Sequence, residues 1–205
     1  ILASTMLITA DLHASDYRDS LAINFREALF HSASLTTGTA FSTTSWSAWP
    51  PFSVALLVLS MAVGGCAGST AGGMKAIRVY LLSRNAAQDI FRLIHPRAVT
   101  PLVLGDRVLP ERLRAGVLGF FFVYVATMAV GTLLIAMHQV PVGQAFGSVF
   151  SCVNITGAFP GAAGTSEFYA GLPATAKTTL AILMLLGRLE LFTVLVLFSP
   201  AFWRA

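Results

Sequence analysis

Long apolar segments alternate with short stretches rich in glycine and threonine along this chain of 205 residues. The clearest apolar segment, Ala115–Met137, has no charged residue and exceeds the roughly 20 residues that a membrane-spanning helix needs. Thr179–Ser199 is predicted to be a second span, although it contains Arg188 and Glu190. Ile1–Ala10 is too short to span and is interpreted as the end of a truncated membrane helix. The pattern predicts an all-α membrane protein.

Two shorter apolar segments, Leu21–Leu35 and Pro141–Val153, lie between the predicted spans. Segments of roughly 10 to 15 residues suit helices that enter a bilayer and turn back better than helices that cross it. A stretch rich in threonine and glycine follows each of them, at Thr36–Thr44 and at Asn154–Gly161. We therefore predict two re-entrant helices, each leading into an irregular loop.

The order of span, half-span, loop and span occurs twice. The two copies overlay without gaps at an offset of 117 positions, which places Thr156 over Thr39, and internal repeats are typical of membrane transporters. We predict a helix–pore-loop–helix unit at residues 1–82, with its first helix truncated, and another at residues 115–205. Residues 83–114, which carry prolines and scattered charges, are predicted to form a cytoplasmic connector.

A run of small residues interrupts the apolar segment Phe52–Leu82. The run, Gly64–Lys75, reads GGCAGSTAGGMK and contains five glycines, which disfavour a helix. Unwound backbone cannot face lipid, because its N–H and C=O groups would have no partners there. A helix broken at membrane depth is typical of transporters and channels. The alternative interpretation is close helix packing through small residues.

Composition and charge support the membrane class. Hydrophobic residues make up 56% of the chain and charged residues 11%, whereas about 25% is ordinary in a soluble domain. Eight of the 13 Lys and Arg residues lie between Lys75 and Arg114, which places that segment in the cytoplasm by the positive-inside rule. The net charge of +4 is small and unevenly placed. We therefore expect the protein to contact membrane lipid and not to bind nucleic acid.

Enzyme motifs do not appear in the sequence. It holds no HExxH motif and no Ser/His/Asp set. Gly68–Lys75 departs from an ATP-binding P-loop, because Met74 separates the glycine from the lysine and Ala76 follows in place of Ser or Thr. Cys66 and Cys152 are interpreted as small buried residues and not as a disulfide framework or a metal site. We expect no enzymatic activity and no covalently bound cofactor.

The two threonine- and glycine-rich loops offer chemistry suited to a cation. Extended backbone can point carbonyl oxygens at a common axis and replace the water shell of an ion. Glycine lets those carbonyls turn where a Cβ would clash, and threonine adds a hydroxyl oxygen. Two such loops supply half of a four-fold ring, so we interpret the chain as part of a longer protein.

Four strings point to a family: GGCAGSTAGGMKAIR at Gly64–Arg78, HPRAV at His95–Val99, LPER at Leu109–Arg112 and LLGRLELFTVLVLFSPAFWR at Leu185–Arg204. With them, nearly the whole chain resembles the TrkH/TrkG/KtrB family of bacterial potassium transport subunits, most closely its TrkH branch. The resemblance implies the third and fourth of four helix–pore-loop–helix repeats around one pore, that is, the C-terminal half of the family's fold.

The resemblance also implies a function and its residues. We expect a multi-pass subunit of the bacterial inner membrane that conducts K+ in a gated, channel-like manner; an ion-coupled K+ or Na+ symporter is the alternative. A cytosolic nucleotide-binding ring of the TrkA/KtrA type and a second copy of the subunit are the expected partners. The implied ion filter, with K+ bound, comprises Thr37, Gly38, Thr39, Ala40, Phe41, Asn154, Ile155, Thr156, Gly157 and Ala158. The implied gating loop comprises Gly64, Gly65, Cys66, Ala67, Gly68, Ser69, Thr70, Ala71, Gly72 and Gly73.

Both filter segments depart from the family's usual pattern. Where the third repeat commonly reads Thr-Thr-Gly-Phe, this chain reads TGTAF, so either Ala40 replaces the filter glycine or Gly38 takes that role in a shifted loop. The gapless overlay favours Ala40. The fourth repeat, commonly Asn-x-Gly-Pro-Gly, here reads NITGAFPG from Asn154. We hypothesise that selection of K+ over Na+ is weaker than is usual in the family.

Three basic residues are singled out. An arginine among apolar neighbours normally faces a cavity or a partner, and the resemblance implies that Arg188 projects into the pore near the gating loop. There it would repel cations and hold the loop closed through its carbonyls; the alternative is a structural ion pair or a snorkelling side chain. Lys75 and Arg78 are interpreted as cytoplasmic anchors, with docking of a regulatory partner as the alternative.

Overall fold

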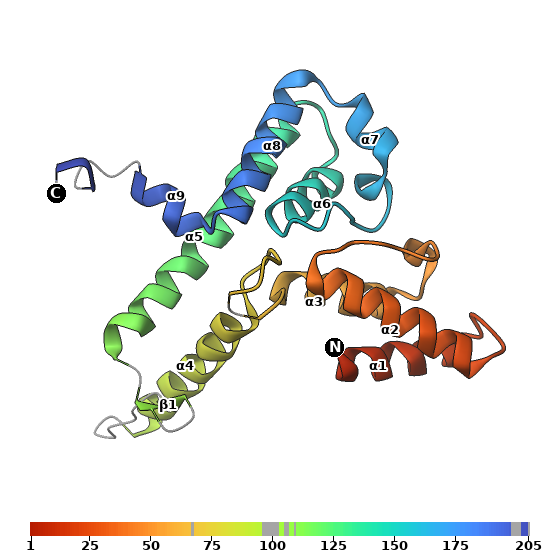
Figure 1. Ribbon diagram of the computed structural model, residues 1–205, viewed down its shortest axis with the longest axis horizontal. Helices are drawn as coiled ribbons and strands as arrows, with labels where there is room; N and C mark the ends of the chain where they lie inside the picture. Colours follow the sequence, from red (N-terminus) through yellow and green to blue (C-terminus); the bar gives the residue numbers. More distant parts are fainter. Residues whose placement is uncertain (67, 96–102, 105–106, 109, 198–201, 205) are drawn as a thin grey trace.

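The computed structural model describes residues 1–66, 68–95, 103–104, 107–108, 110–197 and 202–204, and the described part is almost wholly helical (Figure 1). The α-helices are α1 (Leu2–Ala14), α2 (Leu21–Thr37), α3 (Pro51–Val63), α4 (Ala76–Ile94), α5 (Glu111–Ala136), α6 (Val142–Val153), α7 (Ser166–Gly171), α8 (Ala174–Arg188) and α9 (Leu191–Leu197). The 3-10 turns are η1 (Trp46–Ala48), η2 (Ala162–Gly164) and η3 (Phe202–Arg204). The two-residue strands β1 (Val103–Leu104) and β2 (Arg107–Val108) pair as an antiparallel hairpin.

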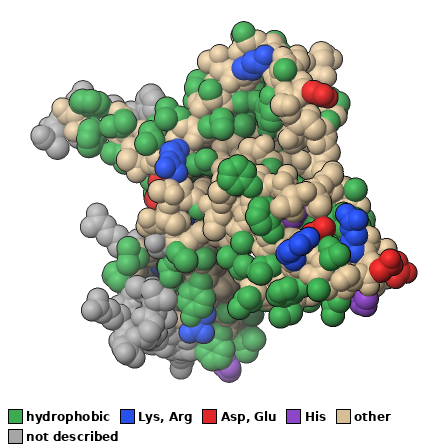
Figure 2. All heavy atoms as spheres, turned by 45° about the vertical axis from the view of Figure 1, so that its right-hand side comes forward, with side chains coloured by type: hydrophobic (Ala, Val, Ile, Leu, Met, Phe, Trp, Pro, Cys, Tyr) green, Lys and Arg blue, Asp and Glu red, His purple; other side chains and the backbone are tan. Residues whose placement is uncertain are grey.

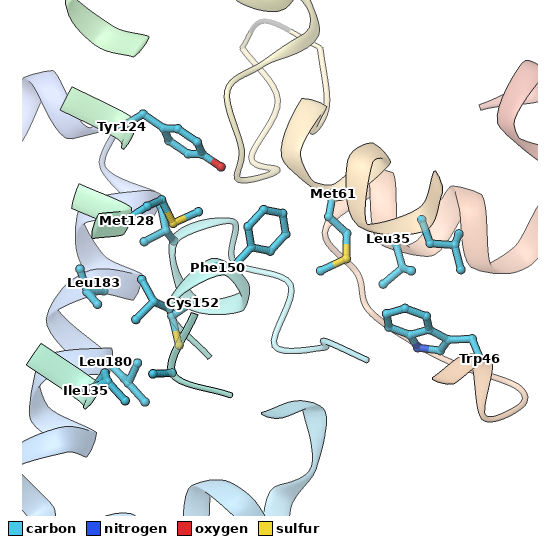
Figure 3. Packing of buried hydrophobic residues seen from close by; sticks show 14 of the residues in the cluster. Leu35, Trp46, Met61, Tyr124, Met128, Ile135, Phe150, Cys152, Leu180 and Leu183 are labelled. Carbon is cyan, nitrogen blue, oxygen red and sulfur yellow. The ribbon is translucent and has the colours of Figure 1, made fainter. Parts of the chain in front are cut away.

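The helices form two packed groups. Helices α1, α2 and α3 contact one another, as do α5, α6 and α8, while α4 packs against α5 (Figure 1). Buried side chains such as Leu35, Trp46 and Met61 belong to the first group, and Tyr124 and Phe150 to the second (Figure 3). In each group two helices pack against a third: α1 and α3 contact α2, and α5 and α8 contact α6.

Helix α5 holds the one stretch of the described chain, Leu113–Ala136, that is long and apolar enough to cross a membrane. Large apolar side chains lie exposed on it; Phe122 is 74% and Leu133 67% exposed. Apolar side chains also cover much of the face shown in Figure 2, with charged groups confined to a few places. Soluble monomers rarely expose apolar surface on this scale, so the surface fits lipid or further protein.

The prediction of one continuous helix at Thr179–Ser199 is wrong. Helix α8 ends at Arg188 and α9 begins at Leu191. Glu190 between them has a left-handed φ of 57°, which α-helical hydrogen bonding does not permit. The segment therefore bends where the sequence places its two charged residues.

The predicted break in Phe52–Leu82 is confirmed, since α3 ends at Val63 and α4 begins at Ala76. Helix α4 then continues to Ile94, through the expected boundary between residues 82 and 83. The predicted connector thus contains the end of α4, the hairpin and the first turn of α5. Its residues 96–102, 105–106 and 109 lie outside the described residues.

Candidate functional site

The loops that follow α2 and α6 share a backbone conformation at matched positions. Gly38 and Ile155, which are related by the offset of 117, have φ values of 76° and 56°. Ala40 and Gly157, related by the same offset, have φ values of 58° and 66°. Left-handed φ is uncommon for residues other than glycine, so its recurrence at two matched pairs indicates the same turn after both helices.

Hydrogen bonds at the helix ends also match. The amide of Thr39 donates to the main-chain oxygen of Ser34, and the amide of Thr156 donates to that of Ser151, both at 3.0 Å. These bonds fold each loop back over the last turn of its helix. Of the two alternatives for the first loop, the geometry favours the gapless overlay, in which Ala40 occupies the position of Gly157, and Gly38 also has the left-handed conformation.

The two loops line one cavity. It has a volume of about 550 Å³. Its lining comes from the chain after α2 and the chain after α6: Ala40, Ser42, Thr43, Thr44, Ser45, Trp46, Ser47, Thr156, Gly157, Ala158, Phe159, Gly161, Gly164 and Thr165. Hydroxyl groups and main chain predominate there, and no Asp, Glu, Lys or Arg is among the lining residues. Such a lining offers a cation neutral oxygen ligands.

Main-chain oxygens of both loops are left without hydrogen bonds in the part of the chain that the structure describes. They belong to residues 38–40 and 154–157. The next carbonyl in each loop is occupied: that of Phe41 accepts the Ser34 hydroxyl at 2.7 Å, and that of Ala158 accepts the Thr156 hydroxyl at 3.4 Å. The free oxygens are chemically able to replace the water around a cation, and they fall within the predicted filter segments.

The chain between α3 and α4 meets both loops. A Cβ on Gly72 would lie 2.0 Å from the main-chain oxygen of Asn154. A Cβ on Gly38 would lie 3.7 Å from the Cα of Ala71 and 3.6 Å from the main-chain oxygen of Ile155. The predicted gating loop therefore lies against the ends of α2 and α6 (Figure 1). Of its predicted members, Ala67 lies outside the described residues.

Two basic side chains bind three consecutive carbonyls of this loop. The Lys75 ammonium donates to the main-chain oxygens of Ser69 at 2.6 Å and Ala71 at 2.5 Å. The Arg188 guanidinium donates to that of Thr70 at 2.5 Å. Hydrogen bonds from charged donors are stronger than neutral ones, so α8 is fastened to the loop at its middle.

Lys75 and Arg78 differ from the surface anchors that the sequence suggested. Lys75 is only 6% exposed, and its ammonium donates hydrogen bonds to the loop. Arg78 forms a salt bridge of 2.7 Å with Glu190, and its guanidinium lies 4.0 Å from the centre of the Phe120 ring. Side chains of the loop, α4, α5 and the α8–α9 bend together enclose a small polar cavity of about 50 Å³. Lys75 thus fastens the loop through its carbonyls, whereas Arg78 ties α4 to the α8–α9 bend through a carboxylate.

Two polar contacts were missed by sequence reasoning. The buried Asn154 accepts the hydroxyl of Tyr124 from α5 at 3.0 Å. On α2, the buried His31 lies 3.3 Å through Nε2 from the main-chain oxygen of Thr44. The sequence held a signal for the His31 contact, because polar residues of α2 recur at helical spacing. The structure buries them together: Asn24, Glu27, His31 and Ser34.

Comparison with known proteins decides the family. The sequence matches the family model described as TrkH, cation transport protein, over residues 3–205. The chain belongs to the TrkH family. It is 40% identical to the Trk system potassium uptake protein TrkH of Salmonella typhimurium over 203 residues, and 42% identical to that of Escherichia coli K12 over 185 residues. These alignments cover 99% and 90% of this chain, but only 42% and 38% of the two relatives.

The fold agrees with a solved TrkH structure. The crystal structure of the potassium transporter TrkH from Vibrio parahaemolyticus superposes with a TM-score of 0.88 at 36% identity. The match covers 98% of this chain and 43% of that one. The chain therefore has the TrkH fold over its length and spans less than half of the TrkH proteins that it resembles.

Proposed function

We propose that this chain is part of the pore-forming subunit of a bacterial potassium uptake system. The observation that carries the proposal is the pair of matched loops with unbonded main-chain oxygens at residues 38–40 and 154–157, of which Ala40, Thr156 and Gly157 line one cavity. In the complete subunit they supply half of a carbonyl filter for K+. The names of the TrkH relatives, Trk system potassium uptake proteins, support K+ as the transported ion.

The architecture proposed for the subunit is a ring of helix–pore-loop–helix repeats in the inner membrane. Residues 1–82 and 115–205 form two of these repeats, joined by a cytoplasmic connector at 83–114. The common φ values and hydrogen bonds of the two loops support the repeat. The exposed apolar surface of α5 supports a membrane setting, with lipid and the remaining repeats as its neighbours.

The gate proposed is the loop Gly64–Gly73. It lies against the starts of both filter segments, where a Cβ on Gly72 would overlap the oxygen of Asn154. Arg188 and Lys75 hold it through three carbonyls. Release of these bonds would let the loop move away from the filter. A cytosolic nucleotide-binding ring of the TrkA/KtrA type, acting on a homodimer of the subunit, is the proposed regulator, and the word "system" in the relatives' names supports a second component.

Cation uptake by the complete protein tests the proposal. In a bacterial strain deficient in K+ import, expression of the complete subunit with its ring partner is expected to restore growth at low K+ and uptake of Rb+. Flux that follows the K+ gradient alone supports a channel, and proton or Na+ movement in fixed ratio supports the symport alternative. A complete protein that reaches the membrane and carries neither K+ nor Rb+ would refute potassium uptake.

Selection between K+ and Na+ is expected to improve when Ala40 is replaced by glycine. Ala40 has a φ of 58°, a conformation that costs a residue with a Cβ about 1 to 2 kcal/mol. Glycine adopts this conformation without strain, so the carbonyl of residue 40 can take the orientation that a selective filter needs. We expect the ratio of K+ to Na+ flux to rise roughly fivefold.

Ala158→Gly is the matched control, because position 158 lies in the second loop without a left-handed φ, and the ratio should not rise. Strong exclusion of Na+ by the unaltered protein would contradict the hypothesis of weak selection.

A further inference from the structure

His31 packs beneath the first filter loop, the chain from residue 38 to residue 44, and does not line the cavity. Its side chain is fully buried, with 0% exposure. It projects from α2, packs edge-on against Trp49 with ring centres 4.8 Å apart, and reaches the outer end of the loop. None of the contacts expected of an ion ligand is made: the residue is absent from the cavity lining to which Ala40 and Thr44 belong.

Both ring nitrogens of His31 face main-chain oxygens. Nδ1 lies 2.9 Å from the oxygen of Glu27 on the same helix, and Nε2 lies 3.3 Å from the oxygen of Thr44. The oxygen of Thr44 also accepts the amide of Trp46 at 3.0 Å. The Nε2 contact therefore acts where the loop turns into η1, on a partly buried carbonyl that has the Trp46 amide as its other partner.

Among the hydrogen bonds of the described residues, this bond has no counterpart in the second loop. The position matched to His31 by the offset of 117 is Ser148. Its hydroxyl donates to the main-chain oxygen of Ala145, within its own helix, at 2.9 Å. The second loop is held differently, by the contact of Asn154 with Tyr124. Any control that His31 has over filter geometry is thus specific to the first loop.

We propose that His31 is a positioning residue for ion selection: its Nε2–H holds the outer end of the first filter loop through the Thr44 carbonyl. The Ser34 hydroxyl holds the same loop four residues from its start, through the carbonyl of Phe41. Between the helix end and these two bonds, the free oxygens of residues 38–40 have little room to move. The proposal rests on the potassium uptake function argued above and adds a determinant of selectivity to it.

Two substitutions separate the two ring nitrogens. In His31→Gln the amide nitrogen has about the reach of Nε2 and can still donate to Thr44. In His31→Asn it has about the reach of Nδ1 and can donate only within α2. In the complete protein we expect His31→Asn to lower the ratio of K+ to Na+ flux roughly fivefold, as loss of one ordinary hydrogen bond would, and His31→Gln to stay within about twofold of the unaltered ratio.

Ser148→Ala serves as the matched control and should leave the ratio unchanged. A residue that merely fills the core would lower the amount of protein and both fluxes together, without changing their ratio. Equal ratios in His31→Asn and His31→Gln would overturn the proposal. Because the unaltered protein is assayed alongside, its failure to take up K+ would refute potassium uptake itself, whereas selective uptake insensitive to His31→Asn would refute only the role of His31.

A measurement on the unaltered complete protein reports on the ring directly and does not depend on the fluxes of the variants. Nitrogen NMR of histidine labelled with ¹⁵N is expected to show the Nε2 of His31 protonated and hydrogen-bonded. The assignment can be made with the His31→Gln variant. A ring that is protonated only at Nδ1 would overturn the proposal, since His31 would then donate nothing to the Thr44 carbonyl.

Discussion

Replacing Arg188 by alanine is expected to raise the basal cation flux of the complete protein about tenfold. The guanidinium is the one contact from α8 to the middle of the gating loop among the described hydrogen bonds, through the oxygen of Thr70. A hydrogen bond from a charged donor contributes about 1.5 to 3 kcal/mol, and the lower figure applies because Arg188 is exposed in this chain. Loss of the bond favours the open position of the loop, and removal of the positive charge lowers the barrier to cations. Basal uptake of Rb+ without the ring partner measures the effect.

Lys177→Ala is the matched control for this substitution. Lys177 lies on the same helix and donates to Ala170, far along α8 from the loop, so its loss should leave basal flux unchanged. If Arg188→Ala gives unchanged flux together with poor folding, Arg188 is a structural residue and not part of a gate.

Replacing Gly72 by alanine is expected to abolish most of the K+ uptake, by tenfold or more. The new Cβ would lie 2.0 Å from the oxygen and 2.3 Å from the carbonyl carbon of Asn154. Both neighbours are main-chain atoms and cannot rotate away as a side chain can, so the gating loop or the filter segment must shift. Overpacking of this kind costs about 1 to 3 kcal/mol. Uptake per amount of membrane-inserted protein, with the melting temperature of the purified protein, measures the two effects.

Gly143→Ala controls for the loss of a glycine. Gly143 lies in α6, the helix whose end Gly72 approaches, and a Cβ there would meet nothing within 4 Å. This variant should keep both uptake and melting temperature. Equal uptake by the Gly72 and Gly143 variants would show that the loop does not press on the filter segment during transport.

The two short helices α2 and α6 and the glycine-rich break were predictable because they depend on local properties. Apolar length sets whether a helix can cross a bilayer, and the expected half-spans at Leu21–Leu35 and Pro141–Val153 correspond closely to α2 and α6. Five glycines within twelve positions of Gly64–Lys75 likewise disfavour a helix wherever the segment is placed. The proximity of Arg188 to the gating loop came from family resemblance and not from its surroundings in the sequence.

The bend between α8 and α9 was not predictable from local properties. It separates Arg188 and Glu190, whose partners are Thr70 and Arg78, at 118 and 112 residues' distance along the chain. The mean hydropathy of the segment stays high, because it contains only two charged residues in a long hydrophobic run. Partners so remote are known only once the chain is folded.

The misjudged basic residues have the same explanation. Lys75 is next to the glycine-rich run in a basic stretch, which by sequence indicates a solvated anchor, yet it is buried because the loop folds its carbonyls around the ammonium. His31 drew no prediction from the sequence. A signal lay in its register with Asn24, Glu27 and Ser34, which turns a polar stripe of α2 toward protein.

The most direct test of the account is the position of a transported ion in the complete protein. Crystals of the complete subunit grown with Tl+, a K+ substitute with strong anomalous scattering, are predicted to show ion density between the chain after α2 and the chain after α6. The main-chain oxygens of residues 38–40 and 154–157 are the expected ligands. Tl+ found only elsewhere along the permeation path, with these oxygens turned away from it, would contradict the filter and the function built on it.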